Sequence, residues 1–521
     1  MLARRHVRRW LPDAALILTM GLGLWLRLQY LDHPLAEAHR WRQVTNADIA
    51  RNFARHSLNI FYPEASWGGP VGYLSMEFPL LQWIAAVLFR LFGESERICR
   101  LVSIAFSIGT LPLVYDVGRR LFGRPVGRAA AFLMAVSPSL VFFGRTFISD
   151  VPMLFFSVAA VLAYVVHAET GRRGPAVLGA ACTALAGLVK LPALLILAPI
   201  AWIIWRRHGW RTLRDPWIGP ALTAAVLLTG AWYWHGDRIY HLTGLGQAIL
   251  HPSGTYAPDI ALAARPMMGV SHWTNYQVLA TWDWYRTLGE RLWSLHLTPV
   301  GAGLALCGLL CLVRIPRRST VDMWLLAAVA VTFVAAQGNY AHEFHQLPLL
   351  PPLALYFGLA AARAFDAPWL REVGGRWWGP VASAGLVTAL ALISFDRSGV
   401  VPILFRPDRL DYLPINAGAA ISRVVAPDQL MVVVEYETYG SNSPILLYRA
   451  DRRGWSFDLH AISPHVIDRL KSRYGATYFA TTMWSAIEAE RPDVVTYLRA
   501  QTRIALDGVH PDAALFRLDG P

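Results

Sequence analysis

Residues 78–92, FPLLQWIAAVLFRLF, are apolar enough to enter a membrane but form a short stretch for crossing one. As a helix this stretch would extend only about 22 Å at 1.5 Å per residue, whereas the hydrocarbon core of a bilayer is roughly 30 Å thick. Whether the stretch crosses decides on which side of the membrane every later loop lies. The loops themselves supply the test, because their charges differ between the two arrangements.

The rest of the chain contains eleven apolar runs near the length of a membrane-spanning helix. They are 13–31, 98–117, 129–144, 151–168, 175–190, 191–206, 217–235, 298–314, 322–338, 347–364 and 378–395. The 521 residues are 55% hydrophobic and 16% charged, with a mean hydropathy of +0.36, which excludes a soluble multidomain protein. We therefore predict a polytopic α-helical membrane protein with about eleven transmembrane helices. No small-residue cleavage site follows the first run, so we expect it to be retained.

Arginine placement decides the sidedness. If 78–92 does not cross, six arginine-bearing segments outside the runs lie on one side, as the positive-inside rule requires; if it crosses, every one of them after the first changes sides. These segments are 4–9, 119–128, 172–173, 206–214, 314–318 and 363–376. Residues 78–92 are therefore predicted to form an interfacial or re-entrant helix, with a cytoplasmic N-terminus. Loop arginines also explain the net charge of +13, so no nucleic acid partner is predicted.

This topology divides the chain into a membrane domain, 1–396, and an outer soluble domain, 397–521. Within the first, 32–97 is the first outer loop with interfacial helices and 236–297 is a large outer loop. The second domain shows alternating strand and helix patterns. The strands are QLMVVVEYE (429–437), ATYFATT (476–482) and AALFRL (513–518), and the helices are PHVIDRLKSRYG (464–475) and DVVTYLRAQ (493–501). We predict a small extracytoplasmic α/β domain that holds together through its core, because it contains no cysteine.

Ionisable residues gather at the predicted outer face. They are His39, Arg42, Glu77, Arg145, Asp150, Lys190, His342 and His345. A charge near hydrocarbon costs about 2.5–3.5 kcal/mol at a helix centre and less toward its ends, so such a gathering indicates a functional site. The four cysteines instead fall inside apolar runs, which favours packing over disulfide or zinc chemistry.

The predicted site suits a polar group carried on a lipid phosphate. Lys190, Arg145 and Arg42, at headgroup depth, could hold the phosphate and stabilise the charge that develops on it as it leaves. Because a phosphate needs no protonation to leave, a single carboxylate that accepts the acceptor's proton would complete the chemistry, unlike the carboxyl pair of a glycosidase.

Five segments, in order, carry a family resemblance. They are HRWRQVTNADIARNF (39–53), MEFPLLQWIAAVLFRLFG (76–93), GRTFISDVPMLFF (144–156), GLVKLPALL (187–195) and HEFHQLPLLPPLALYFG (342–358). Over about residues 13–395 the chain resembles the family 39 glycosyltransferases of the GT-C class, which include protein O-mannosyltransferases, the lipid A aminoarabinose transferase and bacterial relatives.

The resemblance implies a polyprenyl-phosphate-linked sugar as donor and a lipid, glycan or protein as acceptor. Asp150 would organise donor or acceptor, Lys190 and Arg145 would hold the lipid phosphate, and Glu77 would match a glutamate that can bind a divalent metal ion. His39, Arg42, His342 and His345 would contribute to substrate binding.

The first-loop base has two candidates. Where the bacterial pattern places an aspartate, this chain has Thr45, which leaves Glu37 and Asp48 as carboxylates. We favour Glu37, because Asp48 lies three residues past Thr45, the spacing of a capping box that opens an amphipathic helix with Ile49 and Phe53 on one side.

Structural explanations compete with each functional one. Asp150 and Glu77 both precede a proline by two residues, as acidic residues at helix N-termini do. Lys190 could extend to the membrane interface, and Arg42 could contact lipid headgroups. The spacing of His342 and His345 is not that of an HExxH zinc site, so orienting hydrogen bonds are favoured.

The sequence thus predicts an inverting glycosyltransferase, transferring a hexosyl or pentosyl group, in the plasma membrane. A transporter or flippase for a lipid-linked sugar is the first alternative, and it predicts ionisable residues or broken helices near mid-bilayer. A catalytically inactive GT-C-like scaffold is the second, and Thr45 supports it.

Overall fold

The structure, a computed structural model, describes residues 13–209, 217–246, 275–310, 317–366, 385–386, 389–390, 412–436 and 443–518. The chain divides into two compact units. Unit 1 comprises Met1–Leu31, Arg100–Gly230 and Asn275–Phe405, and unit 2 comprises Asp32–Cys99, Ala231–Thr274 and Arg406–Pro521.

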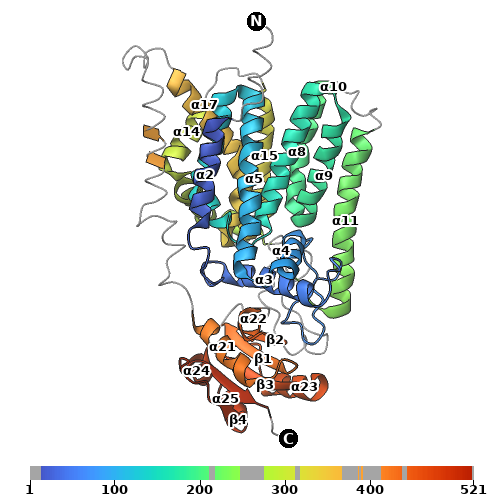
Figure 1. The fold of residues 1–521 in the computed structure, drawn as a ribbon, viewed down its shortest axis with the longest axis vertical. Coiled ribbons are helices and arrows are strands. Elements are labelled where there is room, and N and C mark those ends of the chain that lie inside the picture. Colours follow the sequence, from blue (N-terminus) through green and yellow to red (C-terminus); the bar gives the residue numbers. More distant parts are fainter. Residues whose placement is uncertain are drawn as a thin grey trace. The chain divides into compact units, whose positions relative to one another are not determined.

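Unit 1 is helical. Its α-helices are α2 (Ala14–Leu28), α5 (Glu96–Phe122), α6 (Arg124–Val136), α7 (Pro138–Phe143), α8 (Asp150–Thr170), α9 (Arg173–Val189), α10 (Leu197–His208), α11 (Ile218–Thr243), α13 (Trp282–Glu290), α14 (Thr298–Leu310), α15 (Arg318–Val334), α16 (Ala336–Ala341) and α17 (Leu350–Asp366). Four short turns join them: 3₁₀ turns η1 (Leu191–Ile196), η3 (Gln277–Ala280) and η5 (Glu343–Leu349), and a π-helical turn η4 (Arg291–His296). Of these helices, α5 begins and α11 ends in unit 2. The long helices run side by side (Figure 1).

Three helices in the described part of the chain are long and apolar enough to cross a membrane: Glu96–Phe122, Asp150–Thr170 and Glu343–Ala364. The pair Trp282–His296 and Thr298–Leu310, bent by 108°, raises this number to four if it is one span. The eleven spans expected from the sequence are therefore not confirmed. The last of them, 378–395, lies almost entirely outside the described residues.

One expected span is divided by a break in the helix. The run 129–144 is interrupted at Ser137, which leaves the helical conformation with φ of −53° and ψ of 122° and precedes Pro138, as a residue before proline prefers. The boundary expected between the runs 175–190 and 191–206 coincides with a break at Lys190, whose φ of −157° and ψ of 111° end α9 two residues before Pro192. Hydropathy does not detect the break at Ser137, because the residues around it remain apolar.

Unit 2 begins with the first outer loop, which forms helices α3 (Arg40–Arg55) and α4 (Leu80–Phe92). The stretch 78–92 is thus largely the 13-residue helix α4, about 20 Å long. It packs on α3: Gln82 Nε2 donates to Asn46 Oδ1 over 2.7 Å, and Arg90 Nε donates to the Ala54 carbonyl over 2.8 Å. That α4 lies at the interface instead of crossing stays a prediction.

The C-terminal part of unit 2 is an α/β domain, as predicted. Its sheet has the order β2-β1-β3-β5-β4, with β1 parallel to β2 and β3, and β5 antiparallel to β3 and β4. The strands are β1 (Leu430–Tyr436), β2 (Arg453–Asp458), β3 (Ala476–Thr481), β4 (Thr502–Ile504) and β5 (Ala514–Arg517), and the helices are α21 (Leu413–Val424), α22 (Ile445–Ala450), α23 (Pro464–Tyr474), α24 (Trp484–Glu490) and α25 (Pro492–Arg499).

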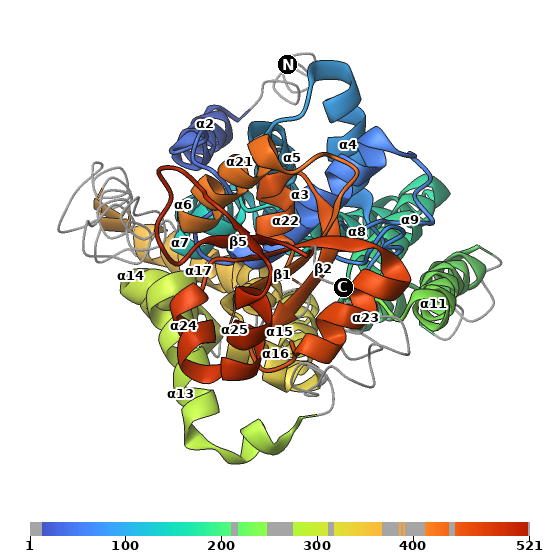
Figure 2. The same cartoon turned by 90° about the horizontal axis from the view of Figure 1, so that it is seen from below.

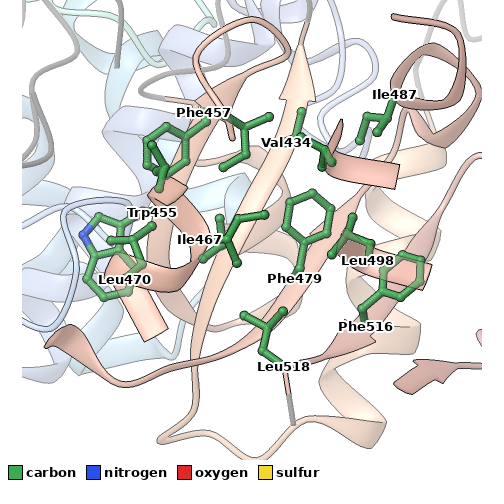
Figure 3. Close-up of a cluster of buried hydrophobic side chains, with 14 of the residues drawn as sticks. Val434, Trp455, Phe457, Ile467, Leu470, Phe479, Ile487, Leu498, Phe516 and Leu518 are labelled. Carbon is green, nitrogen blue, oxygen red and sulfur yellow. The ribbon is translucent and has the colours of Figure 1, made fainter. Parts of the chain in front are cut away.

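Helices cover both faces of this sheet, with α21 and α22 on one and α23, α24 and α25 on the other (Figure 2). A strand buried on both faces reads as a continuous apolar run, which explains LMVVV in β1. Val432 and Val434 pack with Phe457 and Phe479 in one cluster (Figure 3), whereas Met431 points into a second cluster on the opposite face.

Helix α23 shows how local sequence defines an element. Ser463 caps its first turn by accepting a hydrogen bond from the Val466 amide, and Pro464 occupies its first position. Gly475, with φ of +75°, ends it in the left-handed conformation that favours glycine. Side chains on one helix face, Val466, Ile467 and Leu470, then enter the first cluster.

Candidate active site

A buried ion pair joins α8 to the end of α9. Asp150 is the first residue of α8, where the helix dipole favours a carboxylate. Lys190 follows the last residue of α9, and its Nζ lies 2.5 and 2.6 Å from the two Asp150 carboxylate oxygens. The side chains are only 10% and 3% exposed. Two residues 40 positions apart in the sequence thus form one site.

The short turn η5 lies against this ion pair. His345 Nδ1 is 3.7 Å from Asp150 Oδ1. The Lys190 Nζ lies 5.2 Å from the centre of the Phe344 ring, within cation–π range. The His342 ring stacks on the Phe344 ring, with centroids 5.1 Å apart and 9° between the planes. The HEFH segment therefore forms an aromatic and imidazole wall beside the paired charges.

Arg145 lies five residues before Asp150 in the loop between α7 and α8. Its side chain is fully buried, and its Nη2 donates to the Tyr30 carbonyl over 2.7 Å. The loop is tight at Gly144, where a Cβ atom would lie 2.2 Å from the Leu140 carbonyl oxygen and 2.7 Å from Arg27 Nε. This fixes the backbone from which Arg145 extends.

Arg27, which the sequence did not single out, lies in α2 and binds α5 and the end of α6. Its Nε donates to Ser107 Oγ over 2.8 Å, and its guanidinium donates to the carbonyls of Met134 and Ala135 in the last turn of α6. A guanidinium has five donors, and here neutral oxygens accept from it. It thereby satisfies carbonyls that the end of α6 leaves open.

A second polar network lies on the other side of the break at Ser137. His296 is fully buried, with Nδ1 2.9 Å from Ser139 Oγ and Nε2 3.1 Å from Gln346 Oε1. Ser137 Oγ donates to the His296 carbonyl over 2.6 Å. Since Gln346 Nε2 donates to the Asn339 carbonyl, its Oε1 faces the imidazole, so Nε2 of His296 carries a proton. The network fixes η5, and with it His345.

No sequence pattern pointed to His296, and Gln346 was given no role although it lies in the HEFHQLP segment. The one local signal was Ser137 before Pro138, the mark of an interrupted helix. His296 lies 157 residues after Ser139, so only the fold brings them together.

The first-loop candidates lie in unit 2. His39 is the residue before α3 and has a left-handed φ of 59°. Arg42 lies over the Trp41 ring, 5.2 Å from its centre. Glu37 is buried, and its carbonyl accepts from the Arg40 amide over 3.0 Å.

The capping explanation of Asp48 is wrong, because α3 begins at Arg40 and Asp48 lies well inside it. Thr45 Oγ instead donates to the Trp41 carbonyl. Asp48 is fully buried, and both its oxygens are used: Oδ2 accepts from the Ser66 amide over 2.8 Å and Oδ1 from Ser66 Oγ over 2.5 Å. Burial raises the pKa of Asp48, although the Ser66 hydrogen bonds counteract the rise. This arrangement favours a structural role over a catalytic one.

Glu77 is buried in the loop before α4. Its neighbours pack on Trp232, whose Nε1 donates to the Met76 carbonyl over 3.0 Å and whose ring meets Phe78 edge-on at 4.9 Å. Within the described ranges, no group of three or more His, Cys, Asp and Glu side chains gathers in a way that could hold a metal ion. The described residues therefore do not supply a ligand set for a divalent ion at Glu77.

Comparisons with known proteins agree on the fold. Residues 77–234 match the family model of dolichyl-phosphate-mannose-protein mannosyltransferase. These residues include Glu77, Arg145, Asp150 and Lys190. An uncharacterized protein of Aquifex aeolicus (strain VF5) is 28% identical over 129 residues, which are 25% of this chain and 29% of that protein. The chain thus matches less than a third of that relative's length.

Solved structures cover nearly the whole chain at low identity. ArnT from Cupriavidus metallidurans bound to undecaprenyl phosphate is 12% identical, with a TM-score of 0.57 over 97% of this chain and 99% of ArnT. The oligosaccharyltransferase of Archaeoglobus fulgidus, in a complex with Zn and sulfate, is 14% identical, with a TM-score of 0.56 over 94% and 71%. The chain therefore shares the fold of these two membrane enzymes, and its residues 77–234 are similar to the mannosyltransferase family.

Proposed function

We propose that the chain is an inverting glycosyltransferase that moves a hexosyl or pentosyl group from a polyprenyl phosphate to an acceptor at the outer face of the plasma membrane. The N-terminus would be cytoplasmic and the C-terminal domain outside. The observation that carries the proposal is the buried Asp150–Lys190 pair flanked by His345. ArnT binding undecaprenyl phosphate and the archaeal enzyme AglB binding dolichol-phosphate support a lipid-linked donor.

The geometry of Lys190 suits the donor phosphate. Its ammonium group has three N–H donors, and the two short contacts to Asp150 use two of them. The third can bind a phosphate oxygen, and Arg145 in the neighbouring loop can bind another. Asp150 then acts by fixing Lys190 where charge develops on the phosphate.

The reaction follows from these roles. The acceptor oxygen attacks the anomeric carbon from the face opposite the phosphate, and the bond between that carbon and the phosphate oxygen breaks, leaving its electron pair on polyprenyl phosphate. The acceptor's proton passes to a carboxylate, for which we propose Glu37, since both Asp48 oxygens bind Ser66. Displacement from the opposite face inverts the anomeric configuration. No step is assigned to a metal ion.

The acceptor would be a lipid, a glycan or a protein. The archaeal enzyme AglB forms a complex with an inhibitory peptide, which supports a protein as one possible acceptor. Membrane lipids would surround the helices.

The experiment uses the purified full chain in lipid nanodiscs with a polyprenyl phosphate carrying a radiolabelled sugar. We expect transfer to an acceptor extract, or slow donor hydrolysis, and a loss of about 100-fold or more in Lys190→Ala and Asp150→Asn, as for other electrostatic groups. Glu169→Gln is the matched control, because Glu169 pairs with Arg120 at the opposite end of the same helix α8.

Stability has its own control. Removing one partner of a buried ion pair costs about 3–5 kcal/mol, whereas replacing both by neutral groups is often tolerated. The double variant Asp150→Asn/Lys190→Met should therefore fold as well as the wild type but remain inactive. Donor binding without turnover by the wild type would identify a scaffold instead of an enzyme.

One observation favours the transporter alternative, namely the helix breaks at Ser137 and Lys190. Proteoliposomes separate the two functions. Movement of labelled donor between leaflets without cleavage of the sugar–phosphate bond would support a transporter and contradict the proposed reaction.

A further inference from the structure

The segment RADRRG, Arg449–Gly454, makes polar contacts with the first outer loop through four of its six residues; we refer to it as the clip. It joins α22 to β2 within unit 2. Arg449 Nη1 lies 2.6 Å from Glu96 Oε1. The other oxygen of Glu96 accepts from the Leu35 amide over 2.8 Å. Through Glu96, the clip is connected to the beginning of the first outer loop.

The centre of the clip holds the second half of α3. Asp451 Oδ1 lies 2.6 Å from Arg55 Nη1 and 3.5 Å from Arg51 Nη1. The Arg51 guanidinium also lies 3.8 Å from the centre of the Tyr448 ring and donates to the Tyr448 carbonyl over 2.8 Å. Arg55 also forms an ion pair with Glu94, in which Arg55 Nε lies 2.5 Å from Glu94 Oε1. Two arginines one helical turn apart are thus bound by one short segment.

The end of the clip pairs with the loop between α3 and α4 through the backbone. The Gly454 amide donates to the Ser66 carbonyl over 2.9 Å, and the Gly69 amide donates to the Gly454 carbonyl over 2.8 Å. Arg453 adds an ion pair to Glu64 at 2.8 Å. Gly68 and Trp455 thereby form an isolated antiparallel bridge at the edge of β2.

Glycine is required where these backbones meet. A Cβ atom on Gly454 would lie 1.8 Å from the Met431 carbonyl oxygen in β1. Gly69 has a φ of +81°, and a Cβ atom there would lie 2.9 Å from the Trp455 ring. The close approach to β2 thus explains Gly69 of WGGPVG (67–72).

The loop between α3 and α4 is also joined to α3 by the hydrogen bonds between Asp48 and Ser66. An apolar core shared by the first outer loop and the C-terminal domain adds to this contact. One apolar cluster contains Ile49, Phe53 and Trp67 from the first loop together with Ile421 and Leu446 from the C-terminal domain. Most of the stability of a short helix comes from the packing of its apolar face. The C-terminal domain therefore supplies part of the packing that orders the 16-residue helix α3, beside α4.

We propose that the clip is a positioning device, through which the C-terminal domain holds the first outer loop and the residues at its start, Glu37, His39 and Arg42, in place. This gives the C-terminal domain a function in ordering the site, in contrast to service as an acceptor platform. The ordering of the first outer loop by the clip does not depend on the proposed reaction. The expected effect of the clip on turnover rests on the proposed function.

The test is hydrogen exchange by mass spectrometry on the full chain in nanodiscs, comparing wild type with Asp451→Asn. Asparagine tolerates the left-handed conformation of position 451, where φ is 55°, so the variant removes only the charge. Partly exposed ion pairs contribute up to about 1 kcal/mol each. Losing two should raise amide exchange in residues 40–55 about threefold to tenfold while β1 and β3 remain unchanged.

Glu488→Gln is the matched control. Glu488 is 42% exposed and pairs at 3.3 Å with Arg499 inside the C-terminal domain, much as Asp451 is 46% exposed. It should leave exchange in α3 unchanged. A second variant, Gly69→Ala, disturbs the backbone pairing without touching charge and should raise exchange in residues 64–73.

Unchanged exchange in α3 of Asp451→Asn, or an equal rise throughout the sheet, would overturn the proposal. Turnover supplies the second measurement: kcat should fall about threefold to tenfold at an unchanged melting temperature. Increased exchange in α3 with unchanged turnover would show that the clip is only a structural contact, and it would refute the proposal that the clip positions site residues. A wild type that transfers no sugar would count against the proposed function alone, because the exchange result does not depend on it.

Discussion

Single residues in this chain carry roles that their neighbours in sequence do not reveal. Asp150 and Lys190 were predicted as site residues from their place at span ends, and the structure joins them at 2.5 Å. Both are also helix-end residues, so the structural explanation of Asp150 is compatible with the functional one. Their catalytic roles stay a proposal.

Asp48 shows how a correct pattern can lead to a wrong role. The spacing of Thr45 and Asp48 fits a capping box, and Ile49 and Phe53 do share a buried face as predicted. The helix nevertheless begins at Arg40, so the polar residues RWRQ form its first turn, before Thr45. The partner of Asp48, Ser66, lies 18 residues later in a loop, where no periodic pattern could indicate it.

The pH dependence of stability tests the buried state of Asp48. Since burial raises its pKa above the ordinary value of 3.8, the folded protein binds this proton more readily than the unfolded chain. The contribution of Asp48 to the free energy of unfolding is therefore largest below pH 3.8 and falls as pH rises toward the folded pKa, because unfolding then releases a disfavoured charge from burial. Asp48→Asn removes this fall.

We expect the melting temperature of the wild type, relative to Asp48→Asn, to be higher in acid than at neutral pH. Thermal unfolding in detergent micelles from pH 3.5 to 8 measures the difference. A constant offset of about 1 kcal/mol at all pH values would report only a changed hydrogen bond to Ser66, and would show that Asp48 is ionised in the fold as easily as in the unfolded chain.

The sequence predicted some strands and helices of the C-terminal domain and missed others. The strands at 430–436, 476–481 and 514–517 and the helices at 464–474 and 492–499 lie where the pattern placed them. Strand β2 was missed, because RGWSFD lacks the β-branched residues that mark β1. Its partners are β1 and the first outer loop, and pairing with them stabilises a segment of weak intrinsic preference.

Among the helical elements, the break between α6 and α7 could not be read from hydropathy. It is held by Arg27 from one side and by His296 from the other. Both are single polar residues in apolar surroundings, which a hydropathy average hides. The site loop that carries Arg145 and Asp150 depends on this break.

Gly144→Ala tests the element directly. The new Cβ would lie 2.3 Å from Ser107 Oγ and 2.7 Å from Arg27 Nε, so the loop or Arg27 must move. Crowding of this kind costs about 1–3 kcal/mol. We expect a melting temperature several degrees below the wild type and reduced donor turnover.

Gly21→Ala is the control, since nothing lies within 4 Å of a Cβ atom there. It should leave turnover unchanged and raise helix stability slightly, as alanine does in helix interiors. Equal behaviour of the two variants would show that the α7–α8 loop tolerates a side chain at position 144.

The whole molecule consists of two units, each assembled from three separate chain segments. Unit 2 unites the first outer loop with the C-terminal domain, so these should unfold together even though the sequence presents them as a loop and a domain. Sequence could not reveal this association, because the contacts join residues up to 400 positions apart.

Phe479→Ala tests joint unfolding. Phe479 is fully buried in the sheet core shown in Figure 3, and such a truncation costs about 3–5 kcal/mol. In limited trypsin digestion we expect cleavage after Arg51 in α3 to accelerate together with cleavage after Arg469 in α23. Phe479→Leu, which conserves most of the volume, should change both rates little. Acceleration in α23 alone would separate the first loop from the domain.

The contact between Arg51 and Tyr448 spans 397 residues, which has a consequence for biosynthesis. At a synthesis rate of roughly 5–20 residues per second, the first outer loop emerges roughly 20–80 seconds before the segment that orders it has been translated. During that interval α3 lacks its apolar partners from the C-terminal domain, such as Ile421 and Leu446, and it is more exposed to proteases and to premature association. The first loop therefore needs protection until that domain has been translated, and a nascent chain stalled before codon 449 should be degraded from its first loop.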